Sequence, residues 1–269
     1  MKLFKNKKQL QIEIGKFDNI SFVPTMGALH KGHKSIIRKS LKEKGKTVVS
    51  IFVNPKQFNN KKDLNTYPKN NRNDLKILKR LKVDYLYKPT YIDIYKFKTK
   101  NKIYLDNFSK ELCGKFRRGH FKGVVNVVNR LLEIIKPNKI LLGHKDFQQL
   151  YLIKKHIKKN RIKTKVLSCR TIRDKNYIAY SSRLNKLSYN DKLKLIKIIK
   201  LLKNYKRDLI LKKQIHDFKR IKNKIISMGA NKVDYIKPLD LKTLKKPKTN
   251  FFNLFYAIYI RNIRLIDNF

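Results

Sequence analysis

The sequence predicts an α/β protein: a Rossmann-like open parallel sheet with helices on both faces, followed by a smaller C-terminal α+β domain. From residue 20 to about residue 169, short β-branched runs alternate with longer helical segments. This alternation is typical of parallel strands joined by crossover helices. The pattern changes after Arg173. Of the 269 residues, 41% are hydrophobic and spread along the chain, which argues against intrinsic disorder and allows each domain its own core.

The first domain, residues 1–173, is predicted from the order of its elements. We expect strands at 20–23, 47–53, 83–87, 139–142 and 165–168, and helices at 34–44, 74–81, 124–135 and 147–158. The helix at 124–135 has one apolar face because its Val, Leu and Ile residues recur at helical spacing. In a doubly wound sheet, ligands bind beyond the carboxyl ends of the strands, so functional residues are expected there.

The second domain, residues 174–269, has a different pattern. Helices are expected at 191–203 and 217–228, and strands at 233–236 and 253–260. Two helices and two separated strands indicate a small α+β domain. No linker rich in Pro, Gly or Ser separates the domains, so the boundary is predicted from the change of pattern alone.

The net charge is extreme. The chain has 68 Lys and Arg against 18 Asp and Glu, a formal charge of +50, and such an excess usually indicates a polyanionic partner. However, Lys outnumbers Arg about fourfold, whereas bidentate contacts to phosphate and guanine favour Arg. Asn and Ile are also abundant and Trp is absent. We therefore interpret the charge as codon bias of an AT-rich genome rather than as specific nucleic-acid binding.

Several protein classes are excluded by what the sequence lacks. No run of about 18 apolar residues occurs, so we expect no membrane-spanning helix. The Lys-rich start is not followed by an apolar segment, which argues against a secretory signal and favours the cytoplasm. Cys113 and Cys169 lie far apart without metal-ligand spacing, so they are expected to be packing residues in a reducing compartment.

The clearest motif occupies residues 23–33, Val-Pro-Thr-Met-Gly-Ala-Leu-His-Lys-Gly-His. A strand ends at Pro24 and a turn with two glycines leads into a helix, whose unpaired N–H groups and dipole suit phosphate. His30 and His33 are three residues apart and point to the same side. Both can donate hydrogen bonds as charge builds on a leaving pyrophosphate. The alternative is a pair of surface histidines beside an ordinary turn.

This motif resembles the His-x-Gly-His signature of the nucleotidylyltransferase superfamily, and its flanking residues resemble the pantothenate synthetase family. Further segments agree in order: 49–58, Tyr67-Pro68, 117–124, 143–150, 171–173, 181–183, 187–188 and 264–268. They include Asn-Pro-Lys-Gln at 54–57, Gly-His-Lys-Asp at 143–146 and Ser-Ser-Arg at 181–183. Because the segments span nearly the whole chain, their joint agreement is far more specific than any one motif.

The resemblance implies an ATP-dependent ligase. Such an enzyme condenses (R)-pantoate with β-alanine to pantothenate through a pantoyl adenylate, releasing AMP and pyrophosphate, in coenzyme A biosynthesis. ATP is then a substrate, and Mg²⁺ bridges its phosphates without a dedicated protein metal site. The resemblance also implies a homodimer. The first domain would bind nucleotide and pantoate, and the second would act as a lid that keeps water from the adenylate.

The resemblance also assigns site residues. Catalytic roles fall to His33, His30, Lys145 and Arg183, with His33 as the proton-donating group. The expected ATP-binding residues are Met26, Gly27, Ala28, Leu29, His30, Lys31, Gly32, His33, Gly143, His144, Lys145, Asp146, Ile172, Tyr180, Ser181, Ser182 and Arg183. Within this set, residues 181–183 would form a mobile phosphate clamp, and the backbone of Ile172 would lie against adenine.

Three amides are expected to bind pantoate or β-alanine. Asn54 and Gln57 follow a buried strand, and an amide can donate to a carboxylate while it accepts from a hydroxyl; otherwise Asn54 would serve only a turn. Gln149 is assigned by the resemblance. Lys145 can supply a point charge to the α-phosphate. Asp146 either helps to hold the nucleotide or caps the following helix.

The chain departs from the family pattern at several positions. Lys31 replaces an acidic residue that is expected to face solvent, His144 replaces Glu, and Arg118 replaces Pro. Tyr177 stands where Gly is common, and Tyr180 stands where Met or Leu packs near adenine. We expect these changes to affect the turnover rate of the enzyme more than its assignment to the family. Among the other histidines, His120 is expected to stabilise a loop, whereas His156 and His216 are expected at the surface or its boundary.

Two alternatives remain open. One is another nucleotidylyltransferase or adenylate-forming ligase of the same fold. The pair of Gln57 and Gln149 argues against it, because two amides favour a small hydroxy acid as the substrate. The other is a basic nucleic-acid-binding protein that has lost activity, against which the intact histidines, Lys145 and Arg183 argue. Phosphate-backbone binding falls steeply with salt, which separates the second alternative from an enzyme.

Overall fold

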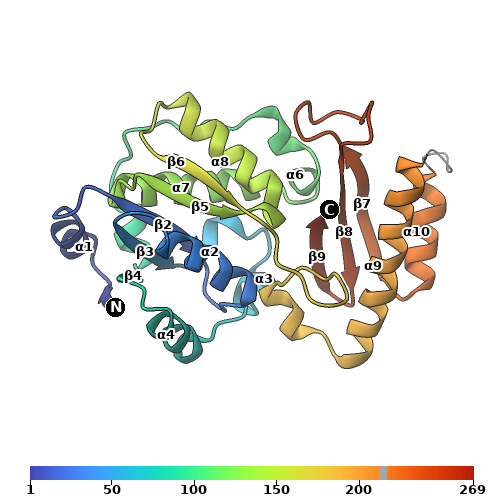
Figure 1. The fold of residues 1–269 in the computed structure, drawn as a ribbon, viewed down its shortest axis with the longest axis horizontal. Helices are drawn as coiled ribbons and strands as arrows, with labels where there is room; N and C mark the ends of the chain where they lie inside the picture. The colour runs from blue at the N-terminus through green and yellow to red at the C-terminus, as the bar shows by residue number, and fades with distance from the viewer. Residues whose placement is uncertain (212–216) are drawn as a thin grey trace. The chain divides into compact units, whose positions relative to one another are not determined.

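The computed structural model describes residues 1–211 and 217–269, which form two compact units, Met1–Ile172 and Arg173–Phe269 (Figure 1). His216 lies outside the described residues. In the described part of the chain, no helix is long and apolar enough to cross a membrane.

The N-terminal unit contains a six-stranded, wholly parallel sheet with the order β1-β4-β3-β2-β5-β6. Its strands are β1 (Lys2–Phe4), β2 (Ile20–Thr25), β3 (Lys46–Ile51), β4 (Tyr85–Tyr87), β5 (Lys139–Gly143) and β6 (Lys165–Cys169). From β2 the chain winds outward through β3 and β4 in one direction, and then through β5 and β6 in the other. The strand order therefore reverses between β2 and β5, and ligands of such sheets bind at the crevice formed there.

Helices cover both faces of this sheet. The α-helices of the unit are α1 (Lys7–Ile14), α2 (Lys31–Leu41), α3 (Lys61–Asn65), α4 (Asn71–Arg80), α5 (Tyr91–Tyr95), α6 (Cys113–Phe116), α7 (His120–Ile135) and α8 (Phe147–Lys159). Three short 3₁₀ turns are η1 (Pro55–Gln57), η2 (Asn107–Lys110) and η3 (His144–Asp146). Successive strand residues alternate between two cores, since Phe22 packs with α1, α5, α7 and α8, and Val23 packs with α2 and α4.

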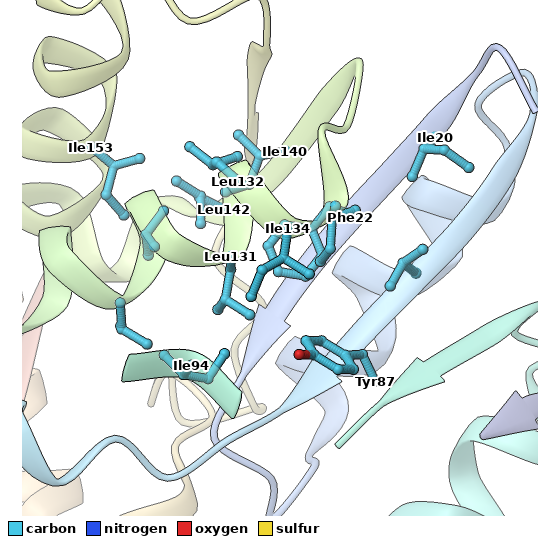
Figure 2. Close-up of a cluster of buried hydrophobic side chains, with 14 of the residues drawn as sticks. Ile20, Phe22, Tyr87, Ile94, Leu131, Leu132, Ile134, Ile140, Leu142 and Ile153 are labelled. Carbon is cyan, nitrogen blue, oxygen red and sulfur yellow. The ribbon is translucent and has the colours of Figure 1, made fainter. Parts of the chain in front are cut away.

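The larger core lies under α7 and α8, as Figure 2 shows. Phe22 of β2, Tyr87 of β4 and Ile140 of β5 are completely buried there, together with Ile153 of α8 and Ile94 of α5. Burying one such side chain contributes about 1.5–3 kcal/mol. The apolar face predicted for the helix at 124–135 is thus confirmed as the face that α7 packs on the sheet.

The C-terminal unit is an antiparallel sheet, β7-β8-β9, packed with two helices. Its elements are η4 (Ser182–Lys186), α9 (Tyr189–Ile210), α10 (Phe218–Ser227), β7 (Lys232–Leu239), β8 (Asn253–Ile260) and β9 (Ile263–Asn268). A capping box starts α9, in which the side chains of Ser188 and Asp191 each accept from the other's backbone N–H. The predicted fold class, a parallel sheet with helices on both faces and a smaller α+β part, is confirmed.

Candidate active site

Two of the predicted motifs meet at the reversal of strand order. β2 ends at Thr25 and leads through a turn into α2, while its neighbour β5 ends at Gly143 and leads through η3 into α8. Both turns therefore lie at the carboxyl edge of adjacent parallel strands. The sequence places His30 and His33 on the first and Lys145 on the second, and the positive charge of Lys145 helps to lower the pKa of both histidines.

The turn after β2 has an unusual backbone. Gly27 and Ala28 both have left-handed angles, with φ of 79° and 50°. A Cβ on Gly27 would also crowd Oδ2 of Asp74, at 3.0 Å, so both the angle and the space favour glycine. The hydroxyl of Thr25 donates to the carbonyl of Ser50 at 2.7 Å and accepts from the N–H of Gly27 at 3.2 Å. These bonds join the turn to β3.

The two histidines cap α2 reciprocally. Nδ1 of His30 accepts from the N–H of Gly32 at 3.2 Å, and Nδ1 of His33 accepts from the N–H of His30 at 3.4 Å. Their ring centroids are 4.0 Å apart, so the prediction that both point to one side is confirmed. Because both Nδ1 atoms accept, a neutral ring carries its proton on Nε2.

Both imidazoles are neutral near pH 7. Burial, followed by the charges of His33 and Lys145, lowers the pKa of His30 to about 3, against an opposing effect of Asp146. Burial and then Lys145 lower the pKa of His33 to about 4. The site therefore offers two Nε2–H hydrogen-bond donors that carry no charge.

The cation of this site is Lys145 in η3. Its side chain is only 16% exposed, and its Nζ lies 3.4 Å from Oδ1 of Asp146. Asp146 precedes α8, but its side chain makes no capping hydrogen bond, so the helix-cap role considered for it is not observed. The ring of His144 packs on Phe147 with centroids 5.3 Å apart, and burial lowers the pKa of His144.

Asn54 is saturated by internal hydrogen bonds. Its Oδ1 accepts from the hydroxyl of Tyr95 at 2.8 Å and from the N–H of Lys56 at 3.2 Å. Its Nδ2 donates to the carbonyl of Gly123 at 3.1 Å and to Oε1 of Gln57 at 3.3 Å. An amide has two donors and about two acceptor positions, so none is left over. With an exposure of 1%, Asn54 is a group that orients Gln57.

The orientation of Gln57 follows from these contacts. A carbonyl can only accept, so Gly123 fixes which end of the Asn54 amide is nitrogen, and Asn54 in turn directs Oε1 of Gln57 toward itself. The Nε2 of Gln57 faces the other way, 2.9 Å from the sulfur of Met26 in the turn after β2. Gln57 thus presents N–H donors toward the motif that carries the histidines.

The backbone of Gln57 is anchored by the start of α7. Nδ1 of His120 lies 2.7 Å from the carbonyl of Gln57, and NH1 of Arg117 lies 3.0 Å from Nε2 of His120. A Cβ on Gly123 would come within 2.1 Å of the carbonyl of Lys56, so this approach requires glycine. His120 therefore has the loop-stabilising position that the sequence predicts.

The two glutamines of α8 differ in their surroundings. Gln148 is buried and bonds to the backbone of Cys113, Phe108 and Glu111 at 3.1, 2.6 and 2.7 Å, which makes it structural. The side chain of Gln149 is half-buried and makes no hydrogen bond to any residue that the structure describes. Its amide is thus available for a ligand.

The predicted clamp residues belong to the C-terminal unit, whereas Ile172 ends the N-terminal one. In the clamp, Oγ of Ser181 accepts from the N–H of Arg183 at 3.3 Å at the start of η4, and Ser182 is buried. Tyr180 and Arg183 are half-buried. Residues 181–183 therefore form a defined turn rather than an extended loop.

The departure at Tyr177 is a backbone departure as well. Tyr177 has a left-handed φ of 67°, which explains why glycine suits this position. Its carbonyl accepts from Arg173 at 3.1 Å, and its ring lies 4.5 Å from the guanidinium of Arg173. Arg173 also bonds Asp267 of β9 at 2.5 Å and 3.2 Å. The motifs at 171–173 and 264–268 thus meet in one ion pair.

One histidine prediction was wrong. His156 was expected at the surface or its boundary, but it is completely buried. Its Nε2 lies 3.0 Å from Oδ1 of Asn129, and its Nδ1 accepts from the N–H of Tyr104 at 3.2 Å and lies 3.1 Å from Nδ2 of Asn160. The lysines around it in sequence occupy the other face of α8. Cys113 and Cys169 are buried, as predicted.

Two residues near the site were missed. Asp74 of α4 accepts from the N–H groups of Ala28 and Leu29 in the turn after β2, and Tyr95 of α5 orients Asn54. Neither lies in a motif, and each contacts its partner across more than forty residues of sequence. No local signal in the sequence could have indicated these contacts.

Comparison with known proteins agrees with the family resemblance of the sequence motifs. The family model of pantoate-beta-alanine ligases matches residues 2–269. A pantothenate synthetase of Flavobacterium psychrophilum is 39% identical over 255 residues, which cover 93% of this chain and 90% of that protein.

The chain belongs to the pantoate-beta-alanine ligase family.

Solved structures of the family have the same fold. A pantoate-beta-alanine ligase of Francisella tularensis, complexed with β-γ ATP and β-alanine, aligns over 100% of this chain and 97% of that chain, with a TM-score of 0.85 and 40% identity. A pantothenate synthetase of Thermus thermophilus aligns with a TM-score of 0.89 and 26% identity, over 100% of this chain and 99% of that chain. The resemblance and the ligase activity expected from it are thereby confirmed at the level of the family.

Proposed function

We propose that the site at the carboxyl edge of β2 and β5 condenses pantoate with β-alanine at the expense of ATP, through a pantoyl adenylate. The observation that carries this proposal is the convergence of two uncharged imidazole donors, the cation of Lys145 and the N–H donors of Gln57. Donors of this kind match the phosphates of ATP and the carboxylate and hydroxyls of pantoate.

In the first step, a carboxylate oxygen of pantoate attacks the α-phosphorus, and the bond to the β-phosphate oxygen breaks. Catalysis of such a step consists mainly of alignment and charge stabilisation. We assign the Nε2–H groups of His30 and His33 to the phosphate oxygens and Lys145 to the α-phosphate. The negative charge of bound ATP raises the pKa of both histidines, which favours the proton-donating role of His33 as pyrophosphate leaves.

In the second step, the amine of β-alanine attacks the acyl carbon, AMP leaves, and the amine loses a proton. Gln57 and Gln149 hold the pantoyl group in this proposal, while Asn54 acts through Gln57 because its own hydrogen bonds are used within the protein. Ser181, Ser182 and Arg183 bind the triphosphate. The C-terminal unit acts as the lid that keeps water from the adenylate.

Magnesium fits this site as an ion held mainly by the nucleotide. Mg²⁺ is usually bound by one or two carboxylates together with phosphates and waters. Asp146, whose side chain is 47% exposed beside Lys145, is the carboxylate available for that role. Within residues 1–211 and 217–269, no group of three or more His, Cys, Asp or Glu side chains could hold a metal. The ion would neutralise phosphate charge.

The localisation, the oligomeric state and the acid substrate are proposed from the family and from the chemistry of the site. We propose that the protein is a cytoplasmic homodimer with no specific nucleic-acid partner. A different adenylate-forming ligase of this fold would use the same histidines and Lys145, but it would not need the Gln57 donors that face Met26. The substrate therefore distinguishes the two enzymes.

The test is release of pyrophosphate from ATP and Mg²⁺, with pantoate present or absent and β-alanine added last. We expect release that requires pantoate, with sustained turnover only after β-alanine. Release with another acid but not with pantoate would replace the proposal by the other ligase. No release from folded protein with any acid would leave nucleic-acid binding as the function to test, by its steep loss with rising salt.

A further inference from the structure

The turn that leads into α2 contains an anion-binding site that is occupied by the protein itself. Successive N–H groups that converge in a turn form a concavity that binds anions. The N–H groups of Ala28 and Leu29 converge in this way, and each donates to one oxygen of Asp74, at 2.8 Å and 2.7 Å. A phosphate therefore has no access to this pair of donors while Asp74 is in place.

The carboxylate is enclosed by the fold. Asp74 is 1% exposed and lies in the first turn of α4, forty-five residues beyond Leu29. Gly27 leaves room for it, since a Cβ there would lie 3.0 Å from Oδ2, which is tighter than an ordinary contact. The close approach that the glycine permits is thus to Asp74. The two amide bonds favour the charged form, whereas burial is the larger effect and raises the pKa of Asp74.

The contact fixes the residues that follow. Leu29 is buried and directly precedes His30, whose backbone N–H is held by His33 and whose ring caps α2. Ala28 has a left-handed angle that a residue with a side chain seldom adopts without a compensating contact. The direction in which both imidazoles face is therefore set by the turn that Asp74 holds.

We propose that Asp74 is a positioning residue for nucleotide binding, whose carboxylate occupies the anion-binding concavity at residues 28–29 and thereby directs the phosphates of ATP to His30 and His33. This inference rests on the proposed function. It does not make Asp74 a group that touches substrate. In this role Asp74 acts as an internal substitute for a phosphate, and its removal opens a competing anion site beside the true one.

The experiment uses three variants. Asp74→Asn keeps the volume but replaces one acceptor by an NH₂ group, which cannot accept from an N–H. Asp74→Ala empties the concavity. Asn70→Ala is the matched control, because Asn70 is the exposed cap of the same helix and accepts from the N–H of Asn73 at 3.2 Å, so its loss weakens α4 without touching the turn.

We expect Asp74→Asn to raise the KM for ATP by at least about tenfold, as the loss of preorganised donors does, with the KM for pantoate little changed. In Asp74→Ala, formate at constant ionic strength should restore ATP affinity, because it supplies the missing carboxylate. Asn70→Ala should lower only the melting temperature. An unchanged KM for ATP in Asp74→Asn, an equal rise in Asn70→Ala, or no restoration by formate would overturn the proposal.

A second measurement does not require activity. In the ¹⁵N–¹H spectrum, the amide protons of Ala28 and Leu29 should resonate downfield because each is bonded to a carboxylate, and both should move upfield in Asp74→Asn. If the parent enzyme shows no turnover but these shifts occur, the proposed function fails while the carboxylate contact stands. If the amides do not move, the positioning role fails whatever the parent enzyme catalyses.

Discussion

At the scale of single residues, the site depends on the direction of hydrogen bonds. Backbone groups fix Nδ1 of both histidines and both ends of the Asn54 amide. Each of these backbone groups can only donate or only accept a hydrogen bond. In the proposed function, substrate therefore meets donors at His30, His33 and Gln57 without a proton having to move first. Such preorganisation costs no rearrangement during the reaction.

Tyr95 supplies the most testable of these contacts. Burial raises the pKa of Tyr95 to about 12, so its hydroxyl remains a donor to Asn54. We expect Tyr95→Phe to raise the KM for pantoate about fivefold, since one hydrogen bond is worth about 1 kcal/mol, with little change in the KM for ATP. Steady-state kinetics with each substrate varied measures both.

The matched control for this variant is Tyr91→Phe. Tyr91 lies on the same short helix, stacks on Tyr95 with ring centroids 4.7 Å apart, and is 44% exposed. It should show unaltered kinetics. Equal effects of the two substitutions, or a larger effect of Tyr95→Phe on ATP than on pantoate, would exclude the orienting role.

At the scale of elements, α7 and α8 are joined by a buried histidine. His156 of α8 lies 3.0 Å from Asn129 of α7, whose Nδ2 donates to Glu133 at 3.0 Å. Burial lowers the pKa of His156 to about 4. In the unfolded chain the group titrates near 6.5, so between these values the unfolded state binds a proton that the native state does not.

The free energy of unfolding should therefore fall as the pH drops from about 6.5 to 4, and the neutral histidines of α2 add to the effect. His156 alone accounts for about 3 kcal/mol, from about 1.4 kcal/mol per pH unit. Urea denaturation at pH 7, 5.5 and 4.5 measures the loss. In His156→Gln the loss should be smaller by about that amount. The same pH dependence in both proteins would show that His156 titrates normally.

Elements and motifs differ in how well the sequence predicts them. β8 is predicted at its observed bounds, Asn253–Ile260, because it is a long apolar run. β1, α1 and β9 were not predicted. β1 has three residues and is rich in exposed positions, and β9 contains Arg264 and Asp267, which the fold pairs with Asp234 and Arg173. The charged residues of β9 are therefore paired with partners that only the tertiary structure supplies.

The same limit applies to the site. His30, His33 and Lys145 follow strands and could be located from the order of elements. Asp74 and Tyr95 could not, because each acts through the backbone or the amide of a distant residue. His156 was misplaced because the lysines beside it in sequence lie on the opposite side of a helix with one buried face.

At the scale of the whole molecule, the charge of +50 is the dominant property. Like charges repel through solvent over about 10 Å at 0.1 M salt, and that repulsion opposes the compact state. We expect the melting temperature to rise by several degrees between 20 mM and 300 mM NaCl. Differential scanning calorimetry in sodium chloride and sodium acetate measures the effect and controls for specific anions. A constant or falling melting temperature would show that the charges are already compensated.

The reciprocal cap at the start of α2 has a consequence for how this protein tolerates substitution. His30 and His33 each use one ring nitrogen to begin a helix, and in the proposed function the other ring nitrogen donates to phosphate. An alanine at either position would weaken the helix start and the chemistry together, so its kinetic cost would overstate the contribution to chemistry. Asparagine, whose oxygen can cap, separates the two costs. Lys31 between them is exposed, so substitutions at that position should be tolerated better than at either histidine.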